Sequence, residues 1–280
     1  IRARLRLACG LPVSESAPAI LAWLDRARGS LAPILGAQGP DLSTCPVGDL
    51  SVGGSILPEN PHALAPAEAA RLGHDAPFWL GRHGEPRLIY TEPAFAGPGR
   101  TDLRRTVHLG VDLFAPAGTP ISTPLDATVV RAGTEDGAQG YGGLVVLRHE
   151  TPAGAFHTLW GHLAAGCGAL APGRRLAAGE VFAHVGTLAE NGGWAPHLHL
   201  QMGFGDDAQW QGVAAPDDRA LALARFPNPA ALLGLPDARV AFAPAPEDEI
   251  LAYRKAHFAA NLKLSYREPV MFLRGWRHHL

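Results

Sequence analysis

The chain has 280 residues, of which 47% are hydrophobic and 18% charged, and its 24 basic and 26 acidic residues give a formal net charge of -2. This composition excludes a disordered tail and allows one large domain or two smaller ones. The nearly balanced charge offers no broad attraction for nucleic acid or an anionic membrane, and no apolar run reaches the roughly eighteen residues that span a bilayer. We therefore expect neither nucleic acid nor a membrane as a partner.

Two residue types that often carry chemistry are scarce. Lys255 and Lys263 are the only lysines, and neither lies in a Schiff-base or phosphate-loop motif, so this segment does not carry pyridoxal chemistry or Walker-type nucleotide hydrolysis. The three cysteines, Cys9, Cys45 and Cys167, are far apart and odd in number. This argues against a disulfide framework or a thiolate zinc cluster and favours a reducing compartment.

The first hundred residues divide into two parts. Residues 1–35 show helical apolar spacing and predict one or two short helices, one of them beginning at Ser16 or Pro18. They form a linker or the end of a preceding domain. Residues 36–101 are rich in glycine, proline and polar residues, and their brief apolar runs DLSVGGSIL and RLIYTEP predict short strands. We expect this accessory mixed region to pack against the next domain and form one wall of a groove.

Residues 102–205 contain closely spaced runs of β-branched and apolar residues with no helical crossover between them, which predicts antiparallel pairing. A helical and loop extension follows over 206–246, and 247–280 form a further helical segment. The expected fold is mainly β, an antiparallel sheet or open barrel with short flanking helices. The predicted strands are VHLGVDLFAP, ATVVRAG, GLVVLRHE, AFHTLWGHL, EVFAHVG and HLHLQM.

Histidines recur in this β-rich segment at spacings that bring side chains together. His108 and Asp112 are four residues apart, and His197 and His199 are two apart. Residues at even separation on one strand share a face of the sheet, so neighbouring strands would gather three imidazoles and one carboxylate. Either spacing alone also occurs in structural or solvent-exposed positions. Together they match the ligands of a catalytic zinc, which leaves one coordination position open for water.

These motifs resemble the lysostaphin-type (LytM-like) zinc metallopeptidases, which cleave peptide bonds in or next to peptidoglycan cross-links. The resemblance covers residues 105–203, through HLGVDLFAPAGTPI, TLWGHL and APHLHLQM in the family's order. It implies that His108, Asp112 and His199 bind Zn²⁺ and that His162 and His197 are non-ligand catalytic histidines. In such a site the metal lowers the pKa of its water, while the two histidines handle protons and the oxyanion. Their individual roles stay open.

The surroundings of these motifs give three further expectations. His157 lies five residues before His162 on one predicted strand and should face the opposite way. His149 and His184 should be surface or packing residues. Trp194, in a turn that is usually a short Gly/Ser stretch in this family, places a bulky indole beside the site.

The ends of the chain suggest a piece of a longer polypeptide, because it opens with IRARLRLACGL and has neither an initiating methionine nor a signal peptide. Residues 247–280 resemble the lead-in to class III aminotransferases. We therefore expect covalently linked aminotransferase-like and kinase-like neighbours, and a cytoplasmic location. In that setting the substrate would be a small peptide or amide, such as a muropeptide fragment or a biosynthetic intermediate.

The sequence is compatible with three functions. The first is zinc-dependent hydrolysis of a peptide or amide. The second is a metal-containing binding or spacer module of a multidomain aminotransferase fusion, without turnover. The third keeps the zinc but catalyses a different reaction, such as ester hydrolysis or lysis.

Overall fold

The computed structural model describes residues 2–51, 74–87, 89–97, 100–204 and 210–243. These residues belong to one compact unit, Ile1–Ala241, apart from the first residues of a second unit, Phe242–Leu280. The helical segment predicted over 247–280 lies outside the described residues, as does most of DLSVGGSIL.

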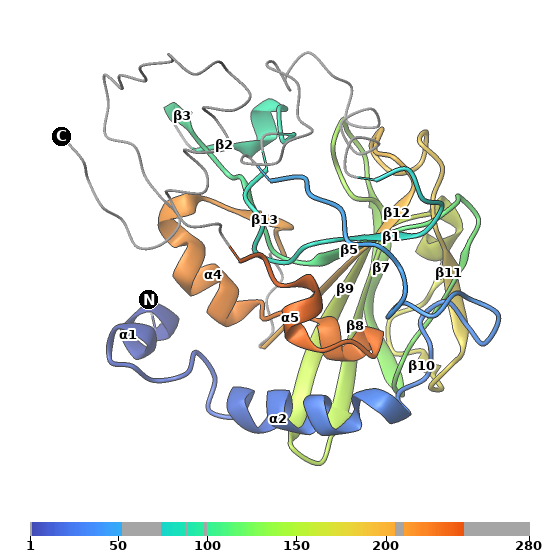
Figure 1. Ribbon diagram of the computed structural model, residues 1–280, viewed down its shortest axis with the longest axis horizontal. Helices are drawn as coiled ribbons and strands as arrows, with labels where there is room; N and C mark the ends of the chain where they lie inside the picture. Colours follow the sequence, from blue (N-terminus) through green and yellow to red (C-terminus); the bar gives the residue numbers. More distant parts are fainter. Residues whose placement is uncertain (1, 52–73, 88, 98–99, 205–209, 244–280) are drawn as a thin grey trace. The chain divides into compact units, whose positions relative to one another are not determined.

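The described part of the chain is built mainly from short strands, with a few helices before and after them (Figure 1). The helices are α1 (Arg2–Ala8), α2 (Ala17–Ala27), α4 (Arg219–Arg225) and α5 (Asp237–Val240). The strands are β1 (Trp79–Gly81), β2 (Ala96–Gly97), β3 (Arg100–Arg104), β4 (Val107–His108), β5 (Val111–Phe114), β6 (Pro120–Ser122), β7 (Ala127–Glu135), β8 (Gly142–Thr151), β9 (Gly154–Leu163), β10 (Arg175–Leu176), β11 (Val181–His184), β12 (His197–Gly203) and β13 (Val213–Ala214).

One seven-stranded sheet organises the fold, in the order β1-β5-β12-β9-β8-β7-β10. Every neighbouring pair in it is antiparallel, which confirms the predicted mainly β, antiparallel class. The edge strands β1 and β10 do not pair with each other, so the sheet is open. Three two-stranded ladders, β11-β6, β13-β4 and β2-β3, complete the strand pairing among the described residues.

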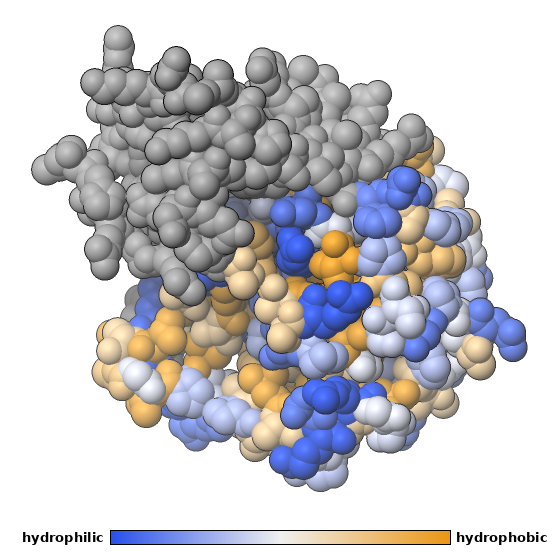
Figure 2. Space-filling model, viewed as in Figure 1, coloured by the Kyte–Doolittle hydropathy of each residue, from blue (hydrophilic) through white to orange (hydrophobic). Residues whose placement is uncertain are grey.

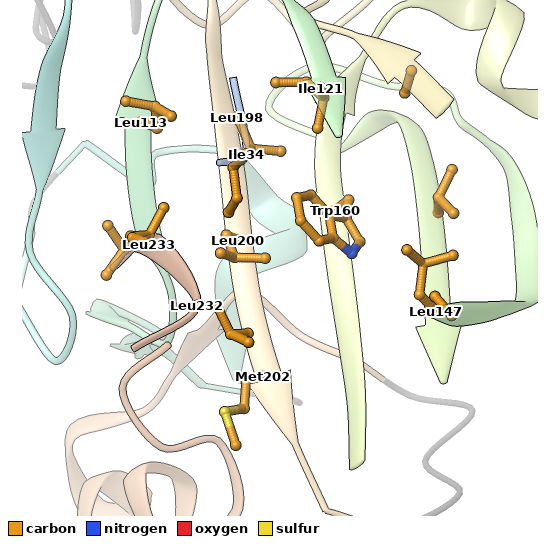
Figure 3. Close-up of a cluster of buried hydrophobic side chains, with 14 of the residues drawn as sticks. Ile34, Leu113, Ile121, Leu147, Trp160, Leu198, Leu200, Met202, Leu232 and Leu233 are labelled. Atoms are coloured by element: carbon orange, nitrogen blue, oxygen red, sulfur yellow. The ribbon is translucent and has the colours of Figure 1, made fainter. Parts of the chain in front are cut away.

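The hydrophobic core covers one face of this sheet. Successive residues of a strand point to opposite faces, and on β12 the core takes Leu198, Leu200 and Met202 (Figure 3). Trp160 of β9 lies fully buried at its centre. Leu232 and Leu233, from the 3₁₀ turn that precedes α5, pack against the same face. The residues between the core positions of β12 are therefore available to the other face.

Helix α2 also covers the core face. It begins at Ala17, with Ser16 at the N-cap and Pro18 in the first turn, as the sequence predicted. Ile20 and Leu24, four residues apart and on one side of the helix, are buried in the core. The prediction of a short helix that begins here is confirmed.

The accessory region contributes to the sheet, but not where its sequence suggested. Strand β1 pairs with β5 over the register Trp79 to Phe114 and Gly81 to Asp112. In contrast, the described residues of RLIYTEP form no strand, and the prediction of one there is wrong. The reason is that the main chain of this segment bonds to side chains of Gln139 and Arg104 rather than to a neighbouring strand.

His149 of β8 is a packing residue, as expected. Its ring stacks on Phe156 with centroids 4.9 Å apart. Its Nδ1–H donates to the carbonyl of Asp126 at 3.2 Å, and its Nε2 accepts from the hydroxyl of Thr158 at 2.9 Å. Burial lowers the pKa of His149 to about 4. The ring is therefore neutral at pH 7.

This burial predicts a loss of stability in acid. In the unfolded chain the pKa of His149 returns to about 6.5, so only the unfolded state takes up its proton as the pH falls below that value. The stability contribution is complete above pH 6.5 and is lost towards pH 4. Between pH 7 and pH 5 the free energy of unfolding should fall by about 2 kcal/mol more for the native sequence than for His149→Gln. Urea denaturation of both proteins at the two pH values measures this, and equal losses would contradict it.

Apolar surface gathers over α1, where Leu5 is 61% exposed, with Leu11 just beyond the helix 49% exposed (Figure 2). Among the residues described, no helix is both long enough and apolar enough to cross a membrane.

Candidate metal centre and cavity

Three of the predicted site residues converge on the face of the sheet opposite the core. Asp112 on β5 and His199 on β12 are direct register partners, so neighbouring strands hold their side chains together. His108 joins them from β4. The atoms His108 Nε2, His199 Nδ1 and Asp112 Oδ1 are separated by 3.0, 3.0 and 3.1 Å, and all three residues are buried.

The structure corrects one step of the argument from spacing. His108 and Asp112 do not share a strand, because Leu109 and Gly110 separate β4 from β5. Glycine at position 110 lets the chain pass close to His199, because a Cβ there would lie 2.6 Å from Cε1 of the His199 ring. The predicted residues meet through this close approach and through the pairing of β4 with β13.

Hydrogen bonds outside the cluster fix which nitrogen of each imidazole carries the proton. His108 Nδ1 lies 2.9 Å from the carbonyl oxygen of Arg82, which can only accept. His199 Nε2 lies 3.2 Å from Oε1 of Gln201, whose amide nitrogen donates to the carbonyl of Gln211. Both outer nitrogens are therefore the protonated ones. The inner nitrogens, His108 Nε2 and His199 Nδ1, present lone pairs to each other.

Asp112 adds a third acceptor to this cluster. Burial opposes its ionisation, but hydrogen bonding to His108 and the charge of the Arg87 guanidinium hold the pKa of the carboxyl well below its usual range. Burial lowers the pKa of His108 to about 4. Three atoms that can each offer a lone pair thus face one another, an arrangement suited to binding a cation.

The set fits a divalent metal. Two imidazole nitrogens and one carboxylate oxygen are preferred zinc ligands, and the separations of 3.0 to 3.1 Å are close to the distance of about 3.3 Å between ligand atoms in tetrahedral zinc. The outer N–H groups donate to a carbonyl and a carboxamide, and such bonds fix the orientation of the imidazoles that would hold the metal. His108, Asp112 and His199 could hold a metal ion.

Sequence reasoning missed one residue of this centre. Arg87 donates from Nη1 to Asp112 Oδ2 at 2.6 Å and from Nε to Glu85 Oε2 at 2.7 Å. All three side chains are buried. Arg87 lies 25 positions before Asp112 in the accessory region, so no spacing pattern of a strand or helix connects them.

His162 and His197 border the same centre without joining the triangle. Their ring centroids are 4.3 Å apart, and His197 Nε2 is 3.8 Å from Asp112 Oδ1. In each ring Nδ1–H donates to a backbone carbonyl, that of Asn191 at 3.1 Å for His162 and that of Ala195 at 2.6 Å for His197. Burial lowers the pKa of both imidazoles, that of His162 well below its usual value. The neutral rings leave Nε2 as a proton acceptor.

A β-bulge in β9 places His162 on this face. Trp160 and Leu163 both enter the core although they are three residues apart, and the register with β8 shifts between Gly143 and Val145. His162 itself has a left-handed backbone, with φ of 61°. Without this extra residue, alternation would have sent His162 to the core side together with Trp160.

The bulge also overturns the expectation for His157. The pairing of β9 with β8 is regular from Leu159 to His157, so His157 lies on the same face as Leu159, opposite Trp160. It therefore shares the face to which the bulge brings His162, and the prediction that the two rings point to opposite faces is wrong. His157 is buried, and His184 is exposed as expected.

Gly161, next to the bulge, leaves space for the ring of Tyr141. A Cβ on Gly161 would lie 2.4 Å from Cδ1 of Tyr141, whose ring packs between His162 and His199 at centroid distances of 5.6 and 5.5 Å. We expect Gly161→Ala to displace Tyr141 and to lower the free energy of unfolding by about 1 to 3 kcal/mol, the usual range for overpacking. Urea denaturation measures this loss. The matched control is Gly166→Ala, where a Cβ meets nothing within 4 Å; equal effects of the two substitutions would contradict the prediction.

A cavity of about 570 Å³ lies beside the centre, and its lining includes His108, His162, His197 and His199. We call residues 89–95 of the accessory region the strap. The strap contributes Ile89, Tyr90, Ala94 and Phe95 to the wall of this cavity, and Arg87 lies beside them. Ile89 and Tyr90 of the strap pack in one buried cluster with Trp194 and Val213, which also line the cavity. The accessory region therefore does form one wall, as expected. The Trp194 indole also stands beside the site, edge-on to His162 at 6.1 Å.

Two side chains hold the strap through its main chain. Gln139 accepts at Oε1 from the backbone N–H of Thr91 and Glu92, at 2.9 and 3.1 Å, and donates from Nε2 to the carbonyl of Ile89 at 3.2 Å. Arg104 donates to the carbonyls of Tyr90, Thr91 and Glu92. Gln139 has a positive φ of 58°, a backbone conformation that costs energy for a residue with a Cβ. These bonds hold the strap in place as one wall of the cavity.

The fold and site together define a mainly β protein with a buried His/Asp/His centre that could hold a metal and that opens into a cavity. Residues 106–210 match the profile of peptidase family M23. The match supports a peptidase M23 domain in this segment, and it extends over less than half of the chain.

Curated relatives match the same part of the chain. It is 36% identical over 95 residues to the "DD-carboxypeptidase/endopeptidase Mpg" of Neisseria meningitidis serogroup B, and equally to that of Neisseria gonorrhoeae. The alignment covers 34% of this chain and 20% of each relative, so the chain spans about a fifth of the length of the curated relatives it matches.

Solved structures show more distant likeness. The catalytic domain of lysostaphin from Staphylococcus simulans is 22% identical over 40% of this chain and 77% of its own length, with a TM-score of 0.30. A zinc-containing peptidase from Vibrio cholerae is 22% identical over 40% of this chain and 31% of its own, with a TM-score of 0.28. A putative peptidase M23 from Pseudomonas aeruginosa is 18% identical over 79% of this chain and 61% of its own, with a TM-score of 0.31.

Proposed function

We propose that this protein is a zinc-dependent hydrolase of peptide or amide bonds. The observation that carries the proposal is the triangle of His108, Asp112 and His199, three lone-pair atoms held 3.0 to 3.1 Å apart with every outer N–H already donated. The imidazoles of His162 and His197 lie next to this triangle and line the cavity. The M23 match over residues 106–210 supports the same class of reaction.

The residues divide the chemistry between them. Zinc held by His108, Asp112 and His199 would polarise the scissile carbonyl and bring the pKa of water towards neutrality. His162 or His197 accepts a proton from the attacking water at Nε2, while the water oxygen bonds to the carbonyl carbon and the carbonyl electron pair moves to oxygen. When the C–N bond breaks, the imidazolium returns that proton to the leaving amine. The carbonyls of Asn191 and Ala195 hold both rings in the orientation that this transfer needs.

The cavity supports a small substrate. A volume of about 570 Å³ lies in the usual range for sites that enclose small ligands, and the strap closes it on one side. We propose a short peptide or amide, such as a muropeptide-like fragment. The name of the Neisseria relatives, with both carboxypeptidase and endopeptidase activity, is consistent with this class of substrate.

The wider context is also a proposal. We propose that the chain belongs to a cytoplasmic polypeptide with an aminotransferase-like neighbour and a kinase-like one, a view that rests on the sequence resemblance of residues 247–280 and on the lack of cysteine pairs. Mass spectrometry of the native polypeptide from its source would show these neighbours. A native protein without them would contradict the proposal.

Metal analysis combined with a substrate screen tests the function. The purified protein should contain about one equivalent of zinc and cleave one or more members of a set of short peptides and muropeptide fragments, detected by mass spectrometry. Chelation should abolish cleavage, and Zn²⁺ should restore it. Full activity in a zinc-free preparation would overturn the proposal. Stoichiometric zinc without cleavage of any amide would favour the binding-module alternative, and cleavage of esters alone would favour a different zinc-dependent reaction.

A further inference from the structure

A buried guanidinium connects the metal centre to the accessory region. Arg87 is 1% exposed and donates to two carboxylates, Asp112 at 2.6 Å and Glu85 at 2.7 Å, which are 2% and 0% exposed. The second oxygen of Glu85 accepts the backbone N–H of Leu50 at 3.2 Å. A chain of polar contacts therefore runs from the main chain of the accessory region to one oxygen of a proposed metal ligand.

These contacts assign different tasks to the two oxygens of Asp112. Oδ2 is occupied by Arg87, whereas Oδ1 faces the nitrogens of His108 and His199. Rotation of the carboxylate about the Cβ–Cγ bond of Asp112 would break its short, charge-assisted hydrogen bond to Arg87. Losing such a bond in a buried setting is costly. Asp112 is thus held to offer a single oxygen to the cluster.

The charges in this group explain why a cation can bind next to an arginine. A guanidinium bonded to Asp112 alone would neutralise the carboxylate and repel a divalent metal ion. Glu85 supplies a second negative charge on the far side of Arg87. Arg82 lies 3.6 Å from Glu85 and equally close to Asp49, so the whole group keeps one net negative charge. Asp112 keeps the charge that attracts a metal and gains a fixed orientation.

We infer that Arg87 is a positioning residue for the metal centre and that Glu85 is its charge-compensating partner. The inference rests on the proposed zinc site and adds to it a part of the chain outside the M23-matched residues 106–210. Arginine is required here because its planar fork reaches two carboxylates at once, which the single ammonium of a lysine does not reproduce.

Two substitutions separate the positioning role from the charge role. Arg87→Lys keeps the positive charge but loses the fork, so it should lower the affinity for Zn²⁺ about 10- to 100-fold and change the visible absorption spectrum of the Co²⁺-substituted protein. Glu85→Gln keeps a hydrogen-bond acceptor for Arg87 but leaves its charge uncompensated. It should also weaken Zn²⁺ binding, while the Co²⁺ spectrum stays that of the native protein. Affinities are measured by competition with a chelator of known strength.

The matched control is Arg174→Lys, which alters an exposed ion pair with Glu180. It should change neither the Zn²⁺ affinity nor the Co²⁺ spectrum. Circular dichroism confirms that each variant is folded; if Arg87→Lys does not fold, the Zn²⁺ affinity of Glu85→Gln decides. Native Zn²⁺ affinity in both folded variants, or in Glu85→Gln when it decides alone, would overturn the inference and leave the zinc site intact. If the unsubstituted protein itself binds no Zn²⁺, the proposed function fails, and the role of Arg87 fails with it.

Discussion

Replacing His199 with alanine is expected to remove both the bound metal and the hydrolytic activity. His199 supplies one of three converging ligand atoms and is the register partner of Asp112, so its loss leaves an imidazole and a carboxylate, which is too few ligands for a catalytic zinc. Because metal activation contributes several kcal/mol to the transition state, kcat/KM should fall by at least about 10³-fold. Metal content is measured on the dialysed protein and activity on the peptide found by the screen.

The matched control for this experiment is another histidine of the same domain. His184, on β11 of the separate β11-β6 ladder, has an exposed side chain that does not line the cavity, so His184→Ala should retain both metal and activity. If His199→Ala kept stoichiometric zinc, the assignment of His199 as a ligand would be wrong. Loss of activity in both variants would indicate a general loss of folding, which circular dichroism would reveal.

Substitution of the cavity histidines should also lower turnover, but here the metal should be retained. His162 and His197 donate Nδ1–H to carbonyls and contribute no atom to the triangle. Loss of a general acid or base lowers kcat about 10²- to 10⁴-fold. We expect this for His197→Ala and for His162→Asn, where asparagine is chosen because it tolerates the left-handed backbone at position 162.

The double variant distinguishes shared from separate roles. If the two rings pass one proton through a common site, combining the substitutions should reduce kcat little further than the more severe single change does. Multiplying effects would indicate independent roles, one at the water and one at the leaving amine. Substantial loss of zinc from either single variant would contradict the division into ligands and proton carriers.

The residues of the metal centre were accessible from the sequence because most of them follow from strand periodicity. His197 and His199 lie two apart on β12, and β12 pairs with β5, which carries Asp112. His108 was identified through an incorrect step, since it lies on β4, beyond a bend at Gly110. The family's motif order supplied that residue where periodicity alone would not have done so.

The rest of the site depends on features that leave no periodic trace. The bulge at His162 is a one-residue departure from alternation, and only the three-dimensional register between β8 and β9 reveals it. Arg87 reaches Asp112 from a segment with no regular structure, and the strap is held by side chains rather than by a strand. Contacts of this kind arise from tertiary packing, which local sequence does not encode.

Strand β1 has a practical consequence for anyone who wishes to produce the M23-matched segment alone. Its three residues cover the outer edge of β5, whose other side pairs with β12. A fragment trimmed to the M23-matched residues would leave the backbone of residues 112–114 unpaired along that edge, beside apolar side chains. Exposed edges of this type recruit strands from other copies. Such a fragment should be prone to self-association, and a soluble one should begin upstream of Trp79.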